Sequence, residues 1–185
     1  MAREQASAGS AEQRGGNRQG GRRNAPAREP RSKSYDEEVV SIRRVDKVVK
    51  GGRRSSFGAF VVLGDSKGKV GWGMAKARQV PLAIDKAVRR GERNVRGYPI
   101  VHGTIPHQVE GRFGAAVVRL LPASEGTGVI AGKSVRYVLE KLGVHNVLSK
   151  CYGSSNPINV VKATFDALAQ LKTKEQYQAL RGVEL

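Results

Sequence analysis

Three short hydrophobic segments follow one another from residue 35 onward. Residues 35–49 include six β-branched residues, which predicts a first strand. Residues 57–63 and 69–75 predict two more strands, because turn-forming residues at 64–68 separate them. Residues 50–56 are polar and contain two glycines, so we expect a loop there. Together these segments predict an antiparallel meander of three strands.

A helical pattern follows the third strand. Pro81 suits the first turn of a helix, where a missing N–H group needs no partner. Apolar or small residues then recur at helical spacing: Ile84, Ala87, Val88 and Gly91. The other sides of this helix carry basic residues: Lys86, Arg89, Arg90 and Arg93. The break at Gly97-Tyr98-Pro99 is the expected domain boundary.

The second half of the chain mixes strands and helices. We expect strands at 105–109 and 115–121, a helix within 126–143, a strand at 144–152 and a last helix from Asn156-Pro157. The predicted fold is therefore α+β, with one domain at 99–172 after a first domain at 35–98.

Polar segments flank these two domains. Residues 1–34 are rich in Gly, Ala, Arg, Gln and Ser and have almost no large apolar residue, which predicts a disordered basic tail. Gly/Arg segments of this kind can become ordered on RNA, although an uninvolved flexible tail fits the composition equally well. Residues 173–185 are expected to be a polar C-terminal tail.

The charge of the chain points to an anionic partner. The net charge is +17 at neutral pH, and residues 43–96 hold fifteen basic and four acidic residues. A charge excess of one sign in so short a stretch is less typical of an ordinary solvated face than of a nucleic-acid-binding surface. Nucleic acid is the first candidate and a membrane surface the second.

A membrane association is the weaker interpretation. The sequence contains no run of about 18 apolar residues and no hydrophobic signal segment near its start. The single cysteine, Cys151, cannot form an internal disulfide and fits a reducing compartment. We therefore expect a cytoplasmic protein with no membrane partner.

No pattern typical of catalysis or metal binding is found. The sulfur and imidazole groups lack zinc-site spacing: His102, His107, His145 and Cys151. Gly132-Lys133-Ser134 resembles the end of a Walker A motif, but Thr127 stands where the first glycine is required. We therefore expect no enzyme activity, no cofactor and no metal.

The expected RNA-binding residues lie in the first domain. In the polar loop, two glycines let the backbone come close to a phosphate, basic side chains supply positive charge and serines supply hydroxyl donors. The residues are Lys50, Gly51, Gly52, Arg53, Arg54, Ser55 and Ser56. A flexible hairpin connection is the alternative. Further phosphate contacts are expected from Arg43, Arg44, Lys76, Arg78, Arg89, Arg90 and Arg93. Trp72 is interpreted as a core or edge aromatic residue rather than a base-stacking one.

Several segments resemble the ribosomal protein S5 family of the bacterial small subunit. They are Lys50–Arg53, Gly68–Arg78, Pro122–Gly132 and Tyr152–Asn159, and the resemblance covers roughly residues 36–170. It implies a first domain like the double-stranded-RNA-binding fold, namely a three-stranded meander with a helix. It implies a second domain of split β-α-β type with two layers.

The resemblance also implies a function and partners. A member of this family is a structural constituent of the small ribosomal subunit in the cytoplasm. It binds small-subunit rRNA near the neck, contacts ribosomal proteins S4 and S8, lies near the messenger RNA path and supports translational accuracy. Gly128 and Arg136 match positions tied to the S4 contact, although simple helix capping by Thr127 is an alternative for this loop.

Two other function classes compete with the ribosomal interpretation. A free double-stranded-RNA-binding regulator or processing factor would carry the same charge and the same first domain. An RNA-dependent nucleotide hydrolase is disfavoured by the incomplete Walker A pattern. Sedimentation of nearly all copies with small subunits distinguishes a ribosomal component from a free regulator.

Overall fold

The computed structural model describes residues 35–182, so the tail expected at 1–34 lies outside the described residues. A first sheet contains β1 (Asp36–Val49), β2 (Gly52–Gly64), β3 (Lys69–Ala77) and β4 (Arg96–Gly97), with α1 (Val80–Glu92) before β4. A second sheet contains β5 (Val109–Phe113), β6 (Ala116–Pro122), β8 (Val147–Gly153) and β7 (Val129–Ile130). The remaining helices are α2 (Lys133–Leu142), α3 (Pro157–Ala169) and α4 (Lys174–Arg181).

The first sheet is the predicted meander with one addition. Its strand order is β1-β2-β3-β4, all antiparallel, and the two-residue β4 pairs with Lys69 and Val70 at the start of β3. The predicted helix is present as α1, and Arg89 and Arg90 lie in its last turn. The α+β class and the meander-plus-helix arrangement are confirmed.

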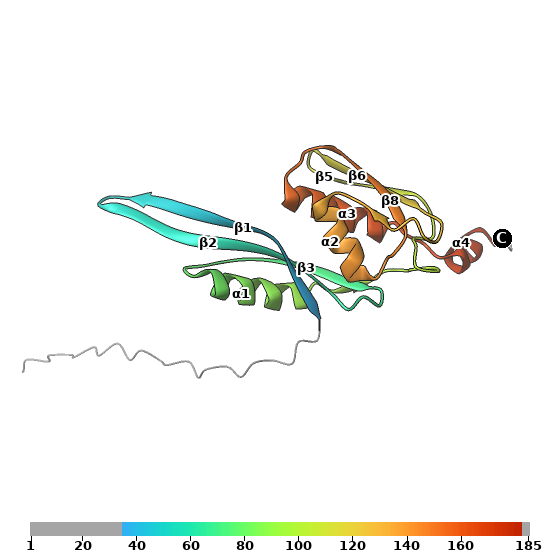
Figure 1. Cartoon of the computed structure of the whole chain (residues 1–185), viewed down its shortest axis with the longest axis horizontal. Helices are drawn as coiled ribbons and strands as arrows, with labels where there is room; N and C mark the ends of the chain where they lie inside the picture. Colours follow the sequence, from blue (N-terminus) through green and yellow to red (C-terminus); the bar gives the residue numbers. More distant parts are fainter. Residues whose placement is uncertain (1–34, 183–185) are drawn as a thin grey trace, which may run out of the picture. The chain divides into compact units, whose positions relative to one another are not determined.

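The middle strands of this sheet are buried on both faces. On one face, Ala59, Val61 and Leu63 pack against Ala83 and Ala87 of α1. On the other face, Phe60, Val62 and Val70 belong to the core shared with the second half of the chain. Figure 1 shows α1 on one side of the sheet, and α2 and α3 between the two sheets.

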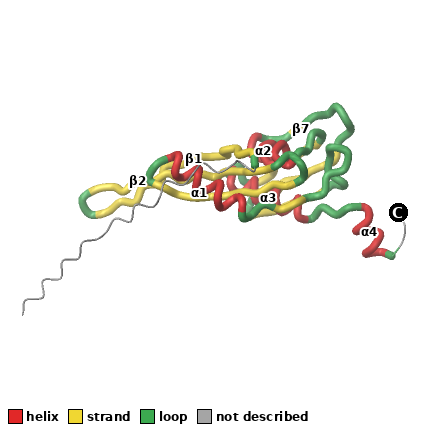
Figure 2. Tube along the Cα trace, turned by 90° about the horizontal axis from the view of Figure 1, so that it is seen from below, coloured by secondary structure: helices red, strands yellow, loops and turns green. Residues whose placement is uncertain are grey.

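The second half is the predicted split β-α-β layer. Its strand order is β5-β6-β8-β7, and β7 and β8 are parallel strands joined by α2. Helices α2 and α3 cover one face of this sheet, and Val135, Val138, Leu139 and Leu142 of α2 are buried as their spacing predicts. The tube in Figure 2 shows α2 and α3 lying beside the strands.

The β2–β3 turn binds the end of α2. The backbone N–H of Ser66 donates to the carbonyl of Lys141 over 3.0 Å, and that of Gly68 donates to the carbonyl of Leu142 over 2.9 Å. These bonds satisfy carbonyls that a helix leaves without partners at its C-terminus. A side chain at Gly64 would collide with the Lys141 carbonyl, so glycine permits this close approach. The hydrophobic core is continuous across residues 98 and 99, and the division into two domains there stays a prediction.

Two element predictions were wrong, and the expected C-terminal tail contains a helix. The expected loop at 50–56 is mostly strand, because β2 begins at Gly52 and pairs with β1 out to Val49. The strand expected at 105–109 is instead β5 at Val109–Phe113, since the turn to β6 is made at Gly114, whose φ is +58°. The polar tail expected from residue 173 stays a prediction; it contains α4, which has no buried residue and which Thr173 and Gln176 begin with a reciprocal capping box.

We expect Gly64→Ala to destabilise the fold by about 1–3 kcal/mol, because the added methyl group forces the β2–β3 turn away from α2. Gly132→Ser is the matched control, since an added Cβ there meets no atom within 4 Å. Urea denaturation of the full chain measures both variants. Equal stability of Gly64→Ala and the unsubstituted protein would contradict the tight junction.

Candidate nucleic-acid interface

The β1–β2 hairpin continues past the rest of its sheet. Pairing of β2 with β3 ends at Phe57 and Ala77, whereas pairing of β1 with β2 goes on to Val49 and Gly52. We call residues 45–56 the arm. Figure 1 shows the arm extending beyond α1 and β3. Five residues of each strand lie in the arm, and at about 3.3 Å per residue they make it roughly 17 Å long.

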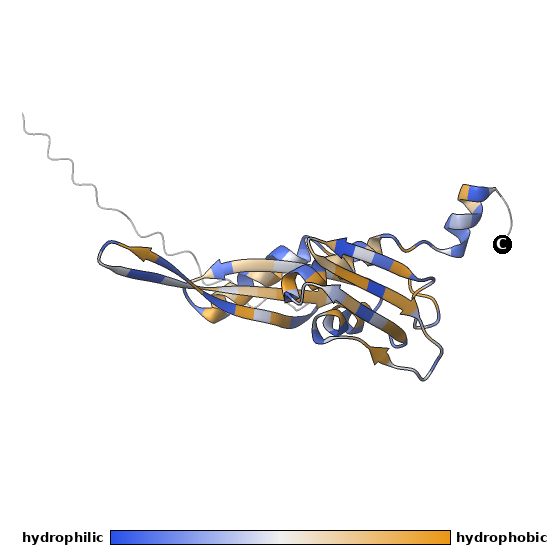
Figure 3. Ribbon diagram, turned by 90° about the horizontal axis from the view of Figure 1, so that it is seen from above, coloured by the Kyte–Doolittle hydropathy of each residue, from blue (hydrophilic) through white to orange (hydrophobic). Residues whose placement is uncertain are grey.

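The arm is exposed and strongly cationic. Val48 is 74% exposed, so the arm buries little apolar surface; in Figure 3 the end of β1 in the arm is hydrophobic and the facing part of β2 is hydrophilic. Within the described part of the chain, the side chains of Lys50, Arg53 and Arg54 form no hydrogen bond or ion pair. The turn closes through Gly51, whose φ of +84° favours glycine. These cations are therefore available to an external anion.

One cross-strand pair in the arm is repulsive. Lys47 lies directly opposite Arg54 in the antiparallel register, so both side chains are on the same face. Like charges in this position destabilise a hairpin. A bound phosphate between them would remove that repulsion. No local sequence signal distinguishes Lys47, because only the register of the hairpin brings it opposite Arg54.

Arg44, the residue before the arm, is held by neighbours on the other face of the hairpin. Its guanidinium lies 3.3 Å from the Asp46 carboxylate and donates to the Ser55 hydroxyl over 3.0 Å. The hydrogen bond from Ser55, together with the charge of Arg44, keeps the pKa of Asp46 below its ordinary value. Arg44 and Ser55 are thus oriented before any ligand binds.

Arg43 and Lys76 lie in one row across the sheet. Arg43 pairs with Gly58, and Gly58 pairs with Lys76, so the two cationic side chains share a face with only a glycine between them. Arg43 also donates to the Asn156 side chain at the start of α3 over 3.1 Å. The two expected phosphate contacts are therefore brought together beside the second half of the chain.

The cations of α1 lie on the opposite face from this row, because α1 packs on the face formed by Ala59 and Val61. Arg90 donates to the Met74 carbonyl over 2.8 Å and so covers part of the open edge of β3. Arg93 and Arg78 are exposed near the two ends of α1, and Arg89 is half-buried. The structure thus divides the predicted contacts between two faces of one sheet and the arm.

The loop before α2 differs from its expected capping. Gly132 is the N-cap residue of α2 and no side chain caps this helix, so capping by Thr127 is wrong. The Thr127 hydroxyl instead lies 3.2 Å from that of Ser124. Gly128 donates its N–H to the Asn146 side chain over 3.1 Å, and Arg136 donates to the Val129 carbonyl over 3.3 Å. Gly128 and Arg136 therefore belong to one local network.

Trp72 is half-buried and packs on Phe60 with ring centroids 5.8 Å apart, which confirms its interpretation as a core or edge aromatic residue.

Burial raises the pKa of the Cys151 thiol. Across residues 35–182, no group of three or more His, Cys, Asp or Glu side chains is placed to hold a metal ion. No helix in that range is long and apolar enough to cross a bilayer.

Comparisons with known proteins agree on one family. The chain matches the description "Ribosomal protein S5, N-terminal domain" over residues 35–97 and "Ribosomal protein S5, C-terminal domain" over residues 111–181. It is 54% identical over 145 residues to the small ribosomal subunit protein uS5 of Rhodopirellula baltica, covering 78% of this chain and 82% of that protein. The same protein of Shewanella loihica is 53% identical over 156 residues, covering 84% of this chain and 93% of the relative.

We expect Ser55→Ala to raise the pKa of Asp46 toward its ordinary value, because the largest influence that lowers this pKa is the hydrogen bond from the Ser55 hydroxyl. Ser56→Ala is the matched control, since the Ser56 hydroxyl donates to the Val45 carbonyl instead. A carboxyl-carbon NMR titration measures both variants. An unchanged Asp46 titration in Ser55→Ala would rule out this preorganised cluster.

Proposed function

Because this chain belongs to the ribosomal protein S5 family, we propose that it binds small-subunit rRNA near the neck through its arm and the adjoining sheet. It is a structural, non-enzymatic component of the small ribosomal subunit in the cytoplasm. The observation that carries the rRNA proposal is the exposed cationic arm, in which Lys47 lies opposite Arg54 and neither side chain forms an ion pair within residues 35–182. Counterion release from bound RNA supplies the driving force.

The proposed mechanism is a clamp on the RNA backbone rather than readout of bases. The arm residues reach between RNA segments, while Arg43 and Lys76 on one face and the α1 cations on the other contact phosphates. Phosphate contacts fix position and orientation without reading sequence. Contacts of this number would make binding fall about 10³–10⁵-fold between roughly 50 and 200 mM salt.

The second half is proposed to contact ribosomal proteins. Gly128 and Arg136 would face S4, and the exposed Ile130 beside them provides apolar surface for that contact. A neighbouring contact with S8 would use another part of the same layer. With the arm near the messenger RNA path, these contacts would support messenger entry and translational accuracy.

Replacing Lys50, Arg53 and Arg54 together with Gln should flatten the salt dependence of rRNA binding. Each lost phosphate contact reduces the log–log slope by about 0.7–0.9, so three contacts reduce it by roughly 2–3. The matched control replaces three exposed lysines of the second half: Lys133, Lys150 and Lys174. Fluorescence anisotropy with transcribed small-subunit rRNA at several salt concentrations measures both slopes. An equal slope in both variants would place the RNA contacts elsewhere.

Gly51→Asp should weaken incorporation into small subunits by roughly tenfold, because it adds a negative charge among the cations of the arm. Gly51→Asn is the matched control, since Asn has the same size and the same tolerance for a positive φ but no charge. Quantitative sedimentation of cell extracts measures the bound fraction. A defect of equal size in both variants would show that backbone conformation, rather than charge, is responsible.

A mostly free pool of the unsubstituted protein would favour the free RNA-binding regulator instead.

A further inference from the structure

A cleft of about 510 Å³ lies between β3 and the layer formed by β5 and α3. Its volume is in the range of small-ligand sites. The cleft combines aromatic, cationic and amide side chains: Trp72, Asn94, Arg96, Tyr98, Phe113 and Lys162. None of these residues was expected from the sequence to contact RNA. They come from both halves of the chain and meet only in the folded structure.

The apolar part of the cleft consists of two rings with a cation between them. The Lys162 ammonium lies 5.1 Å from the centre of the Trp72 ring and 4.5 Å from that of Phe113. Phe113 is 42% exposed, so one of the two rings is open to solvent. Aromatic faces beside a cation are the arrangement that binds unpaired bases and their phosphates.

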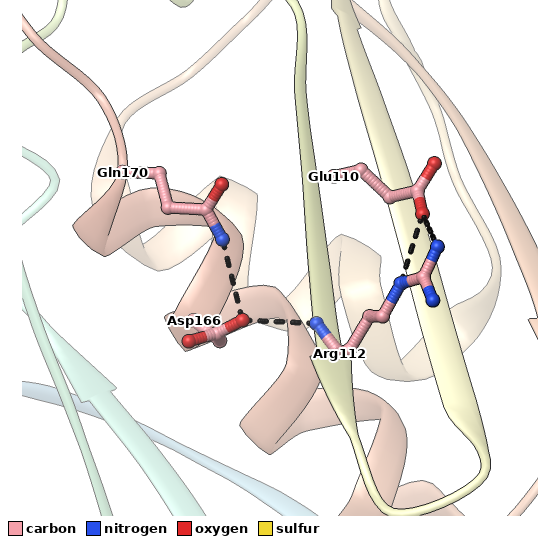
Figure 4. Close-up of polar contacts among 4 residues, drawn as sticks. All are labelled: Glu110, Arg112, Asp166 and Gln170. Atoms are coloured by element: carbon pink, nitrogen blue, oxygen red, sulfur yellow. Dashed lines mark hydrogen bonds and ion pairs between the residues drawn. The ribbon is translucent and has the colours of Figure 1, made fainter.

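Asp166 provides a fixed acceptor in the wall of the cleft. Its Oδ2 accepts from the Arg112 backbone N–H over 2.9 Å and from the Gln170 amide over 3.3 Å (Figure 4). The Arg112 guanidinium binds Glu110 over 2.7 Å instead, so it does not neutralise Asp166. The carboxylate is therefore oriented by bonds to one oxygen, which leaves Oδ1 to accept from an amino group.

The cleft continues the proposed RNA-binding surface. Arg90 binds the Met74 carbonyl, and the Asn94 amide donates to the Trp72 carbonyl over 3.3 Å, so the end of α1 follows the open edge of β3. Arg96 lies two residues beyond Asn94 and lines the cleft. Backbone phosphates bound along α1 would lead the RNA strand to this cleft.

We propose that the cleft binds one unpaired nucleotide extruded from an rRNA helix. Its base stacks on the exposed ring of Phe113, beside Trp72, and its phosphate lies at Arg96 and Lys162. An exocyclic amino group donates to Asp166, so adenine, cytosine and guanine are favoured over uracil, which lacks that group. This inference rests on the proposed function, because the duplex flanking the nucleotide is held by the α1 and arm cations.

The experiment uses the full chain and two RNA duplexes, one perfectly paired and one with a single bulged adenosine. Trp72 is the only tryptophan in the sequence, so its fluorescence reports on the cleft directly. We expect the bulged duplex to quench this fluorescence and to bind roughly tenfold more tightly than the paired duplex. A bulged uridine should give a smaller gain. Binding is measured in parallel by anisotropy of labelled RNA.

Phe113→Ala and Arg96→Gln should each remove most of the advantage of the bulged duplex while leaving binding of the paired duplex close to its original strength. Lys150→Gln, on the outer face of the second sheet, is the matched control and should leave the advantage intact. Equal affinity for both duplexes without quenching would overturn the nucleotide site and leave the proposed function standing. Failure to bind the paired duplex would instead contradict the proposed function. Quenching by an acidic peptide but by neither RNA would assign the cleft to a protein partner and overturn the inference.

Discussion

Burial of the first sheet on both of its faces is the constraint on which the rest of the structure depends. Its middle strands contact α1 on one face and the shared core on the other. The turn at Ser66 and Gly68 binds the last carbonyls of α2, so the two halves are joined by directional bonds as well as by apolar contact. This junction fixes where the arm begins and how α1 and α3 lie on either side of the sheet.

The arm can be polar because the sheet beneath it is fully packed. A two-stranded ribbon on its own has marginal stability, and this one contains a repulsive pair at Lys47 and Arg54. The buried strands that continue into the arm hold its register, and the Arg44–Asp46–Ser55 cluster adds local order. The packed core thus stabilises a projecting hairpin whose like charges would destabilise it in isolation. The same charges can bind RNA phosphates.

The same junction creates the cleft at the edge of β3. Strand β4 covers only the first two residues of that edge, so the carbonyls of Trp72 and Met74 are bound by side chains from the end of α1. Asn94 and Arg90 thereby occupy the edge that another strand would otherwise pair with. These side chains block the addition of another strand at this edge. The cleft beside the aromatic rings is still open to a ligand.

The sequence by itself determined the α+β class, the meander, α1 and the buried face of α2. Hydrophobic spacing and turn residues are local signals, and Val135, Val138, Leu139 and Leu142 are buried as that spacing predicts. It also located the positive charge in residues 43–96, because charge depends on composition alone. The family resemblance was available from the same motifs.

Only the tertiary structure decided which of these groups meet. The polar residues 52–56 form a strand because β1 supplies hydrogen-bond partners, and local propensity carries no information about a partner. The opposition of Lys47 and Arg54 depends on strand register, and the meeting of Trp72 with Phe113 and Lys162 depends on the packing of two halves far apart in the sequence. Such contacts are set by the shared core, which no single segment specifies.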